Sequence, residues 1–507
     1  MARFKQLWVK ILLAIIALAC VYAISRLWNL TKLPIFTDEA IYIRWSQIGS
    51  RDASWRYISL VDGKQPLFTW IMMVFLRFIR DPLVAGRLVS VAAGVFSLVA
   101  MWLLSFELFK SKKISFLTSI LYLASPFTLV YDRLALYDSL VSTFSLWNLY
   151  IAVLLVRHLR LDLALILGMT LGAGMLNKSS GFLSLYMLPV TLLLFDWQKK
   201  HKGERFLRWV GLVIVAAVLS QGIYTILRLS PLYAMIGQKD VVFIYSFHEW
   251  IRHPFTFMVG NLRGLFDWLI HYLTWPIFAV SLIPIAICRK LYKEKILLYL
   301  WWIVPFLALA SFGRVLYPRF ILFMAMPLLI LASLAIAWFM KRTGRSVLGL
   351  AILGILFIPS IYADYFIIMN PLYAPLPFSD KSQLIDDWPS GWGVPEVNRF
   401  LTEQSKSSKV SIYTEGTFGL LPYAIEMYQL DNPNVKVHGL WPVPPQPTVQ
   451  ILEDAVDHPT YILFNLTQAV PPWPMQFIAE YQKGNRKDVK MRLFRVVPTQ
   501  KQTSTLK

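Results

Sequence analysis

Charged residues and cysteines are scarce in this sequence of 507 residues. Charged side chains occupy 16% of the positions and hydrophobic ones 57%, with a mean hydropathy of +0.54. Since a soluble domain has about 25% charged and about 45–50% apolar residues, the composition excludes an ordinary soluble protein and predicts a membrane protein with many spans. The two cysteines, Cys20 and Cys288, both lie in apolar runs. They exclude a disulfide framework and leave the redox compartment open.

Apolar runs long enough to cross a membrane are frequent. The run 67–79 is too short for a span, contains Arg77 and follows Pro66. The basic N-terminus followed by an apolar run resembles a signal peptide, but no small-x-small cleavage site follows, so we predict an uncleaved first helix. Because a spanning helix needs about 20 mostly apolar residues, we predict a polytopic α-helical protein with eleven spans, at 8–28, 83–109, 114–131, 139–156, 161–176, 180–197, 209–228, 265–288, 296–311, 319–340 and 346–361.

Acidic residues are fewer than basic ones, 29 against 50, which gives a net charge of +21. In a soluble protein this charge would suggest a nucleic-acid partner. If 67–79 lies on the outer membrane surface, the basic clusters between spans all fall on one side. The positive-inside rule then predicts a cytoplasmic N-terminus, an extracytoplasmic C-terminal region and no nucleic-acid partner. The clusters are Arg3/Lys5/Lys10, Lys110/Lys112/Lys113, Arg157/Arg160, Lys199/Lys200/Lys202/Arg205/Arg208, Arg289/Lys290/Lys293/Lys295 and Lys341/Arg342/Arg345.

The character of the chain changes after residue 361. We predict a transmembrane domain over 1–361, whose first outer loop is 29–82, and a small extracytoplasmic α/β domain over 362–507. Strands are expected at Val410–Tyr413, Val435–His438, Tyr461–Asn465 and Met491–Val497, alternating with helices at 395–405, 418–429, 447–456 and 474–482. This alternation favours a partly parallel sheet.

The pair Asp38-Glu39 directly follows the first apolar run. Two carboxylates at a membrane exit suggest an acid/base site, because a charged, oriented carboxylate is what a general base needs. The alternative is a structural pair of loop carboxylates, or an N-cap for a helix that begins near Ala40. The two interpretations are compatible, since a helix N-terminus favours the charged carboxylate.

Other charged residues collect in the outer loops. Lys64 suits a lipid phosphate or a headgroup. Asp132 and Asp138, six residues apart around Arg133, suit either a cation site or local structure. Basic residues near span ends either meet a phosphate or snorkel to the interface. These are Arg87, Lys178, Arg263, Arg314 and Arg319.

The histidines of the stretch His248–His253 exclude one enzyme class. His248 and His253 are five residues apart, whereas the zinc-protease helix needs two histidines four apart on one face. We therefore reject a zinc protease.

The motifs in this order resemble a known family, the polyprenyl-phosphate-sugar-dependent glycosyltransferases of the C-type membrane fold (GT-C). That group includes the protein O-mannosyltransferases and the bacterial aminoarabinose transferases that modify lipid A. The motif resemblance covers mainly 30–180, and the helix pattern extends it to about 361. The residues that carry it are Asp38-Glu39, Lys64-Gln65-Pro66, Arg87, Arg133–Asp138, Asn177-Lys178 with Gly181, and Tyr317-Pro318-Arg319.

The resemblance implies an inverting glycosyl transfer on the outer face of the membrane. The donor would be a sugar on a polyprenyl phosphate, and the acceptor a hydroxyl of a protein, lipid or glycan. Asp38 would take the proton from that hydroxyl, Lys64 would meet the departing phosphate, and Glu39 and Asp138 would shape the site or help to hold a cation. The aminoarabinose transferases have an acid where this chain has Gly63, so we assign no metal ligand and leave a divalent metal open. The remaining residues assigned to phosphate or sugar are Arg87, Arg133, Lys178 and Arg263.

Two other function classes remain as alternatives. A transporter or lipid-linked-glycan flippase would have charges near the membrane midplane and paired broken helices, whereas the acids here gather at one face and no internal repeat is present. A non-catalytic membrane assembly or binding protein would work through 362–507 and would be favoured if activity survived Asp38→Asn. Neither the sugar nor the acceptor follows from the sequence.

Overall fold

The computed structural model describes residues 2–344 and 347–498, which form two compact units. The first, here the helical unit, contains Met1–Leu30, Ser54–Ile71 and Arg87–Pro377. The second, here the sheet unit, contains Thr31–Ala53, Met72–Gly86 and Phe378–Lys507. The sheet unit is thus assembled from three separate parts of the sequence.

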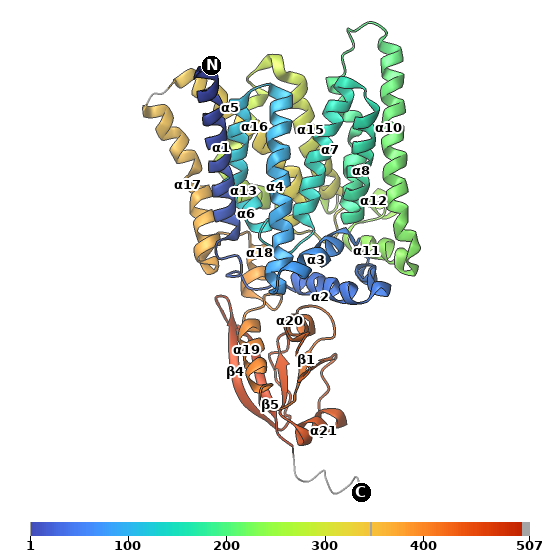
Figure 1. Cartoon of the computed structure of the whole chain (residues 1–507), viewed down its shortest axis with the longest axis vertical. Coiled ribbons are helices and arrows are strands. Elements are labelled where there is room, and N and C mark those ends of the chain that lie inside the picture. The colour runs from blue at the N-terminus through green and yellow to red at the C-terminus, as the bar shows by residue number, and fades with distance from the viewer. Residues whose placement is uncertain (1, 345–346, 499–507) are drawn as a thin grey trace. The chain divides into compact units, whose positions relative to one another are not determined.

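The helical unit is a bundle around one buried helix, α16 (Leu322–Thr343). The membrane-length segment Pro318–Thr343 that contains α16 is 89% buried, against 22% for Lys202–Leu229 and 17% for Ala351–Met369. The last two segments therefore lie at the rim, as Figure 1 shows for α10 and α17. The other long helices of this unit are α1 (Ala2–Leu27), α4 (Pro82–Phe109), α5 (Lys112–Leu123), α7 (Asp138–His158), α8 (Leu161–Asn177), α10 (Lys202–Tyr224), α13 (Met258–Leu273), α15 (Tyr292–Phe312) and α17 (Val347–Met369).

Glycines allow α8 and α10 to run side by side at close range (Figure 1). A Cβ on Gly168 would lie 2.9 Å from the Ala216 carbonyl oxygen, and one on Gly172 would lie 2.8 Å from Ile223 Cβ. Small residues at such a contact let two helices approach closely within a membrane.

The prediction of eleven spans is not confirmed. Within the described residues, six helices are long and apolar enough to cross a membrane, or seven if one bent pair counts as a single span. That composition supports an integral membrane protein. The run 114–131 breaks between α5 and α6 (Pro126–Tyr131), and 180–197 forms the short helices η3 (Ser179–Gly181), α9 (Phe182–Tyr186) and η4 (Leu188–Leu194).

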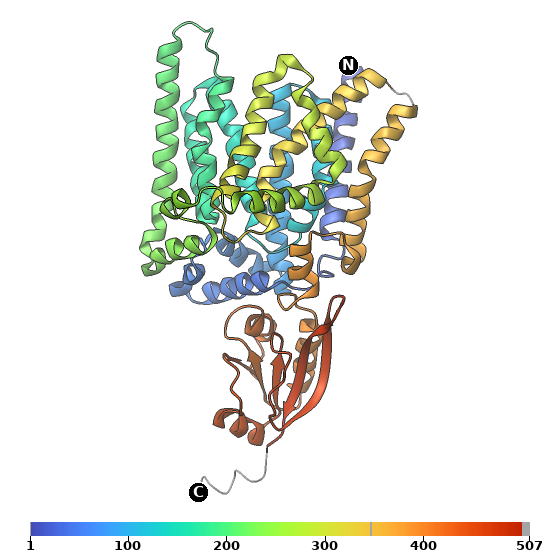
Figure 2. The same cartoon turned by 180° about the vertical axis from the view of Figure 1, so that it is seen from behind.

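The predicted span 265–288 is the bent pair. Helix α13 and the segment Trp275–Ile285, which contains α14 (Trp275–Leu282), meet at 104°. Thr274 lies at the bend with φ of +64°, a positive value that β-branched residues rarely adopt. Figure 2 shows α13 lying across the long helices rather than along them.

Short helices fill the segments that we expected in outer loops. They are η2 (Ile58–Asp62), α3 (Leu67–Phe78), α11 (Met235–Phe243) and α12 (Phe247–Arg252). The 12 residues of α3 rise only about 18 Å, less than the roughly 30 Å of a hydrocarbon core. Its length agrees with the exclusion of 67–79 from the spans, and its place on the outer surface stays a prediction.

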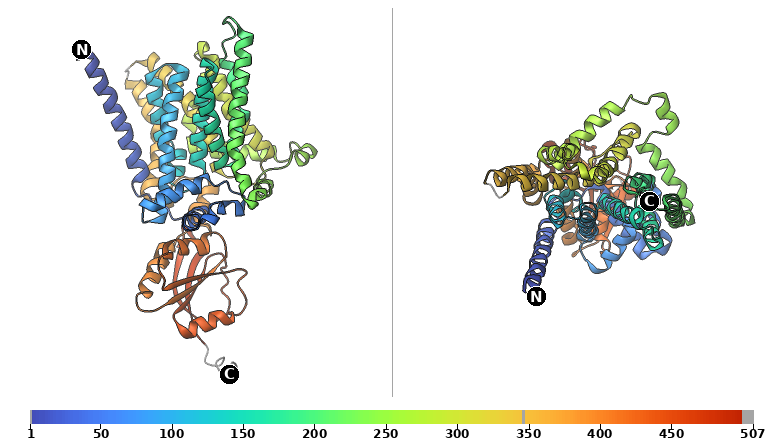
Figure 3. Two further views of the ribbon diagram at one scale, coloured as in Figure 1. Left: turned by 45° about the vertical axis from the view of Figure 1, so that its right-hand side comes forward. Right: turned by 90° about the horizontal axis from the view of Figure 1, so that it is seen from above.

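The sheet unit contains a five-stranded mixed sheet in the order β2-β1-β3-β5-β4 (Figure 3, left). Strands β1, β2 and β3 are parallel, and β3, β5 and β4 are antiparallel. The partly parallel sheet is therefore confirmed. Its elements are β1 (Val410–Glu415), β2 (Val435–Leu440), β3 (Thr460–Phe464), β4 (Met475–Lys483), β5 (Arg486–Val496), α19 (Val394–Gln404), α20 (Leu420–Gln429) and α21 (Val449–Asp457).

The helix predicted at 474–482 is wrong, because this segment is the edge strand β4. Gly484, at φ of +50°, and Asn485 form the tight turn that joins β4 to β5. The hairpin pairing places Phe477 opposite Phe494, with ring centroids 5.6 Å apart. Cross-strand aromatic pairs of this kind stabilise a strand that its local pattern does not identify.

Candidate active site

Asp38 and Glu39 lie in the first turn of α2 (Thr37–Arg51), in the sheet unit. Glu39 is fully buried, and its Oε2 accepts a hydrogen bond from the Phe36 backbone N–H at 2.9 Å. This bond satisfies a donor at the start of the helix, as a capping carboxylate does. Asp38 is half-buried. The geometry thus gives Glu39 a capping contact and leaves part of the Asp38 side chain accessible.

Helix α2 packs on α20 in the same unit. Arg44 pairs with Glu426 at 2.6 Å, and the Gln47 side-chain amide donates to the Met427 carbonyl oxygen at 2.9 Å. The Trp45 ring lies 6.0 Å from that of Phe418. The acidic pair therefore stands at the start of a helix that is fixed along its length.

Lys64 lies in the helical unit, in the turn between η2 and α3. Gly63 precedes it with φ of +64°, and a Cβ there would overlap the Lys239 side chain and lie 2.5 Å from the Met235 carbonyl oxygen. Helix α11 thus packs directly against the turn. This contact leaves no room for a side chain at position 63.

A chain of hydrogen bonds connects this turn to η3 and α11. The Gln65 amide donates to Ser179 Oγ at 2.7 Å, and Ser179 Oγ donates to Asp240 Oδ1 at 3.0 Å. Burial raises the pKa of Asp240, and the Ser179 hydrogen bond and the charge of Lys64 oppose that rise. Lys239 pairs with Asp62 at 2.5 Å.

Four basic side chains surround one pair of aromatic rings. The rings of Phe243 and Phe320 are 5.9 Å apart. Lys64 Nζ lies 5.4 Å from the Phe243 centroid, and Lys178 Nζ lies 4.5 Å from that of Phe320. Such distances suit cation–π contacts. The cationic cluster, as we call it below, consists of Lys64, Lys178, Lys239 and Arg319.

Asp138, the first residue of α7, belongs to the same region through Lys178. Lys178 Nζ pairs with Asp138 Oδ1 at 2.7 Å, and the Asp138 carboxylate is almost fully buried. The structure thus brings together Lys64, Asp138 and Lys178, three of the predicted site residues. A set of ammonium groups held at an aromatic pair suits an anion such as a phosphate.

Arg87 and Arg133 are buried at the C-terminal end of α1. Arg133 Nη1 donates to the Ser25 and Trp28 carbonyl oxygens, each at 2.8 Å, and Arg87 Nη1 donates to the Leu30 carbonyl oxygen at 2.7 Å. The Ser25 carbonyl is one of those that a helix end leaves unpaired, and the Trp28 and Leu30 carbonyls lie in the turn that follows α1. Since these three hydrogen bonds all go to backbone oxygens, a substrate role for either arginine stays a prediction.

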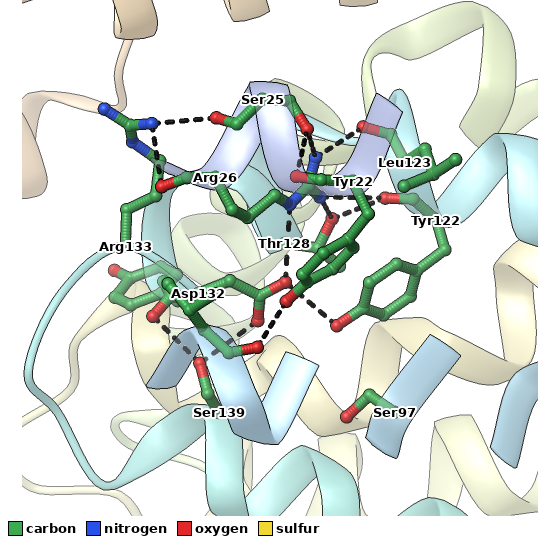
Figure 4. Close-up of polar contacts among 12 residues, drawn as sticks. Tyr22, Ser25, Arg26, Ser97, Tyr122, Leu123, Thr128, Asp132, Arg133 and Ser139 are labelled. Atoms are coloured by element: carbon green, nitrogen blue, oxygen red, sulfur yellow. Dashed lines mark hydrogen bonds and ion pairs between the residues drawn. The ribbon is translucent and has the colours of Figure 1, made fainter. Parts of the chain in front are cut away.

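Asp132 faces Arg26 (Figure 4). Arg26 Nε lies 3.7 Å from Asp132 Oδ2, and the Tyr122 hydroxyl donates to the same oxygen at 3.0 Å. The Arg26 guanidinium also donates to Thr128 Oγ1 at 2.9 Å. Each of the two acids thus has its own cation, and residues 2–344 and 347–498 hold no group of three or more His, Cys, Asp or Glu placed to bind a metal.

The remaining predicted residues lie elsewhere in the helical unit. Arg263 is exposed on α13, and Arg314 pairs with Glu249 at 2.7 Å. Lys239, Asp240 and Phe243 were not among the residues predicted from the sequence. Lys239-Asp240 is an adjacent pair of opposite charges within the apolar stretch 231–245, which was an available signal.

Two comparisons relate the chain to known proteins, and a third finds no match. Residues 63–224 match the family model of the dolichyl-phosphate-mannose-protein mannosyltransferases. No curated protein matches. The apo crystal structure of ArnT from Cupriavidus metallidurans matches with a TM-score of 0.57 at 14% identity, over 98% of this chain and 100% of that chain. The same protein bound to undecaprenyl phosphate matches with a TM-score of 0.59 at 14% identity, over 96% and 99%.

Proposed function

We propose that this chain, which has the GT-C glycosyltransferase fold, transfers a sugar from a polyprenyl-phosphate donor to a hydroxyl acceptor on the outer face of the membrane. The family-model match over 63–224 supports the resemblance that the motifs indicated, and the similarity to ArnT shows that the chain has the GT-C fold. The donor, the acceptor and the side of the membrane belong to the proposal.

The cationic cluster is the observation that carries it. Lys64 and Lys178 make cation–π contacts with the aromatic pair Phe243 and Phe320, and Asp138 forms an ion pair that orients Lys178. Charge develops on the leaving phosphate as its bond to the sugar breaks, and fixed ammonium groups stabilise that charge without reorganising. A polyprenyl phosphate, the kind of lipid bound by ArnT in one matched structure, has the headgroup that such a cluster would hold.

Asp38 is the proposed general base. The acceptor oxygen would attack the anomeric carbon, the bond from that carbon to the phosphate oxygen would break, and the hydroxyl proton would pass to the Asp38 carboxylate. Polyprenyl phosphate would leave with the bonding electrons, and the anomeric configuration would invert. Two features support this role: the partial exposure of Asp38 and its position in the first turn of α2, where the helix dipole favours a charged carboxylate.

The test follows label from radiolabelled polyprenyl-phosphate sugars in proteoliposomes. We expect wild type to release label from the lipid and Asp38→Asn to lose at least about 100-fold in rate, since general bases contribute about 10²–10⁴-fold. Asp431→Asn, which changes an exposed carboxylate of the same unit, serves as the control. Equal release by wild type and Asp38→Asn would remove Asp38 as the base, and movement of intact lipid-linked sugar across the bilayer would instead favour a flippase.

A further inference from the structure

The segment that leads into Asp38 is held by a loop of the sheet unit. Phe36 forms an isolated antiparallel bridge with Ser390. The Thr37 backbone N–H and hydroxyl both donate to the Pro389 carbonyl oxygen, at 3.0 and 2.9 Å, and Gly391 N–H donates to the Ile35 carbonyl oxygen at 2.7 Å. Residues 35–37 and 389–391 therefore lie against each other as two short extended strands.

The contact is too close for a side chain at Gly391. A Cβ there would overlap the Ile35 side chain and lie 2.6 Å from the Ile35 carbonyl oxygen. The position of 35–37 thus depends on the position of the loop 389–391.

A buried lysine donates hydrogen bonds to the backbone of that loop. Lys483, the last residue of β4, is completely buried, and its Nζ donates to the Ser390 carbonyl oxygen and, at 3.5 Å, to that of Trp392. Burying an amino group costs free energy unless its donors are satisfied. Here the compensating acceptors are the carbonyls of the loop that pairs with Phe36.

A buried carboxylate holds the start of the same loop. Glu415, at the end of β1, accepts hydrogen bonds from the backbone N–H groups of Asn465 and Leu466 at 2.8 and 2.7 Å. The Asn465 side-chain amide then donates to the Trp388 carbonyl oxygen at 3.0 Å. The two ends of the loop are thus attached to the sheet by separate buried polar groups.

We propose that Lys483 is a positioning residue for Asp38, acting through the loop 389–391 and the paired segment 35–37. This inference deepens the proposed function and rests on it for the role of Asp38. It gives the α/β domain a part in catalysis: the sheet sets where the base stands. A misplacement of about 1 Å can cost about 100-fold in rate, so loosening this attachment has a measurable effect.

The test compares Lys483→Met with Lys490→Met in the full chain. The first removes the buried donors at similar side-chain length, and the second removes a lysine on the neighbouring strand β5 that pairs with Glu480. We expect Lys483→Met to lower kcat at least about tenfold with the donor KM within twofold of wild type, and Lys490→Met to change neither. In a chain that already carries Asp38→Asn, adding Lys483→Met should lower kcat little further.

Hydrogen exchange gives a second readout that needs no activity. Amides 36–40 should exchange faster in Lys483→Met than in wild type or Lys490→Met. Unchanged exchange there, or a change that runs through the whole sheet unit, overturns the positioning role even if transfer is confirmed. Absence of transfer by wild type with the expected exchange pattern overturns the proposed function alone. If Lys483→Met does not fold, Thr37→Val, which removes one bond to Pro389, replaces it with the same expectations at a smaller magnitude.

Discussion

The lysines of the cationic cluster differ in the groups that they contact. Lys64 contacts the Phe243 ring and acts on Asp240 through its charge, whereas Lys178 also neutralises the buried Asp138. Removing Lys178 therefore leaves the buried Asp138 carboxylate without its cation. Loss of one partner of a buried ion pair is strongly destabilising.

We predict that Lys64→Met lowers kcat/KM for the lipid-linked donor about 30- to 100-fold while leaving the unfolding temperature within about 2 °C of wild type. The loss corresponds to about 2–2.7 kcal/mol, the scale of a charge-assisted hydrogen bond. Lys178→Met should lower both kcat/KM and the unfolding temperature. Lys406→Met, in an exposed pair with Glu403, is the control and should change neither. An unchanged kcat/KM in Lys64→Met would exclude Lys64 from donor binding.

The buried amino group of Lys483 makes the stability of the sheet unit depend on pH. Burial lowers the pKa of Lys483 to about 7, and the nearby charge of Asp387 opposes that shift. An unfolded lysine keeps its proton up to about pH 10.4, so between about pH 7 and pH 10 the unfolded chain binds one proton more than the folded chain. The contribution of Lys483 to stability therefore rises with pH across this window.

We accordingly expect the unfolding temperature of wild type to rise relative to that of Lys483→Met from pH 7 to pH 10. Below pH 7 the difference should be flat, because both states are protonated. Differential scanning fluorimetry of the full chain in one detergent, at constant ionic strength, measures it. Parallel curves for the two proteins across the window would contradict the lowered pKa.

At the scale of elements, the turn before α3 and the helix α11 form one tightly packed contact. Gly63→Glu puts a side chain where α11 leaves no space, in a left-handed conformation that costs about 1–2 kcal/mol for other residues. We predict a loss of stability above that figure and a displaced Lys64, seen as a lower unfolding temperature and a higher donor KM. Gly237→Ala, on α11 with open space around it, is the control and should be neutral or slightly stabilising. An unfolding temperature of Gly63→Glu equal to that of wild type would contradict this prediction and show that α11 can shift to accommodate the side chain.

Elements with strong local signals were predictable from the sequence, and elements set by tertiary contacts were not. Strands β1, β2 and β3 appear within a few residues of their expected places, since each is a short apolar run between turn residues. Strand β4 was missed because only its partner β5 makes it a strand. The bend at Thr274 was missed because apolar composition measures length and not direction.

The same division holds for the candidate site. Asp38, Lys64, Asp138 and Lys178 were predicted as site residues because charged side chains are uncommon near membrane spans. The last three do lie close together in the structure. Their catalytic and binding roles stay predictions. Lys239 and the loop 389–391 were not predicted. Their roles depend on tertiary contacts with residues far away in the sequence, which no local sequence pattern indicates.

At the scale of the whole molecule, the acidic pair is built into the sheet unit although it lies more than 300 residues before the sheet in the sequence. The buried residues of α2 include Ala40, Ile41, Ile43 and Trp45, and helix α20 lies against α2. Without 378–507, the apolar surface of α2 that α20 covers would be exposed to water, at a cost of about 25 cal/mol per Å². The C-terminal domain is then part of the framework that holds Asp38, the proposed base.

This arrangement predicts that truncation after Pro377 abolishes transfer while the helical unit still enters the membrane. The truncation removes the loop 389–391 and helix α20, which contact the segment 31–53. We therefore expect proteases to cleave this segment. Limited proteolysis of proteoliposomes, with donor turnover measured on the same sample, reports both effects. Arg51→Ala is the control, because it breaks only the exposed pair with Asp431, worth about 0–1 kcal/mol, and should leave turnover and cleavage as in wild type. Turnover by the truncated chain would show that the base stands correctly without the sheet, and would remove the C-terminal domain from the mechanism.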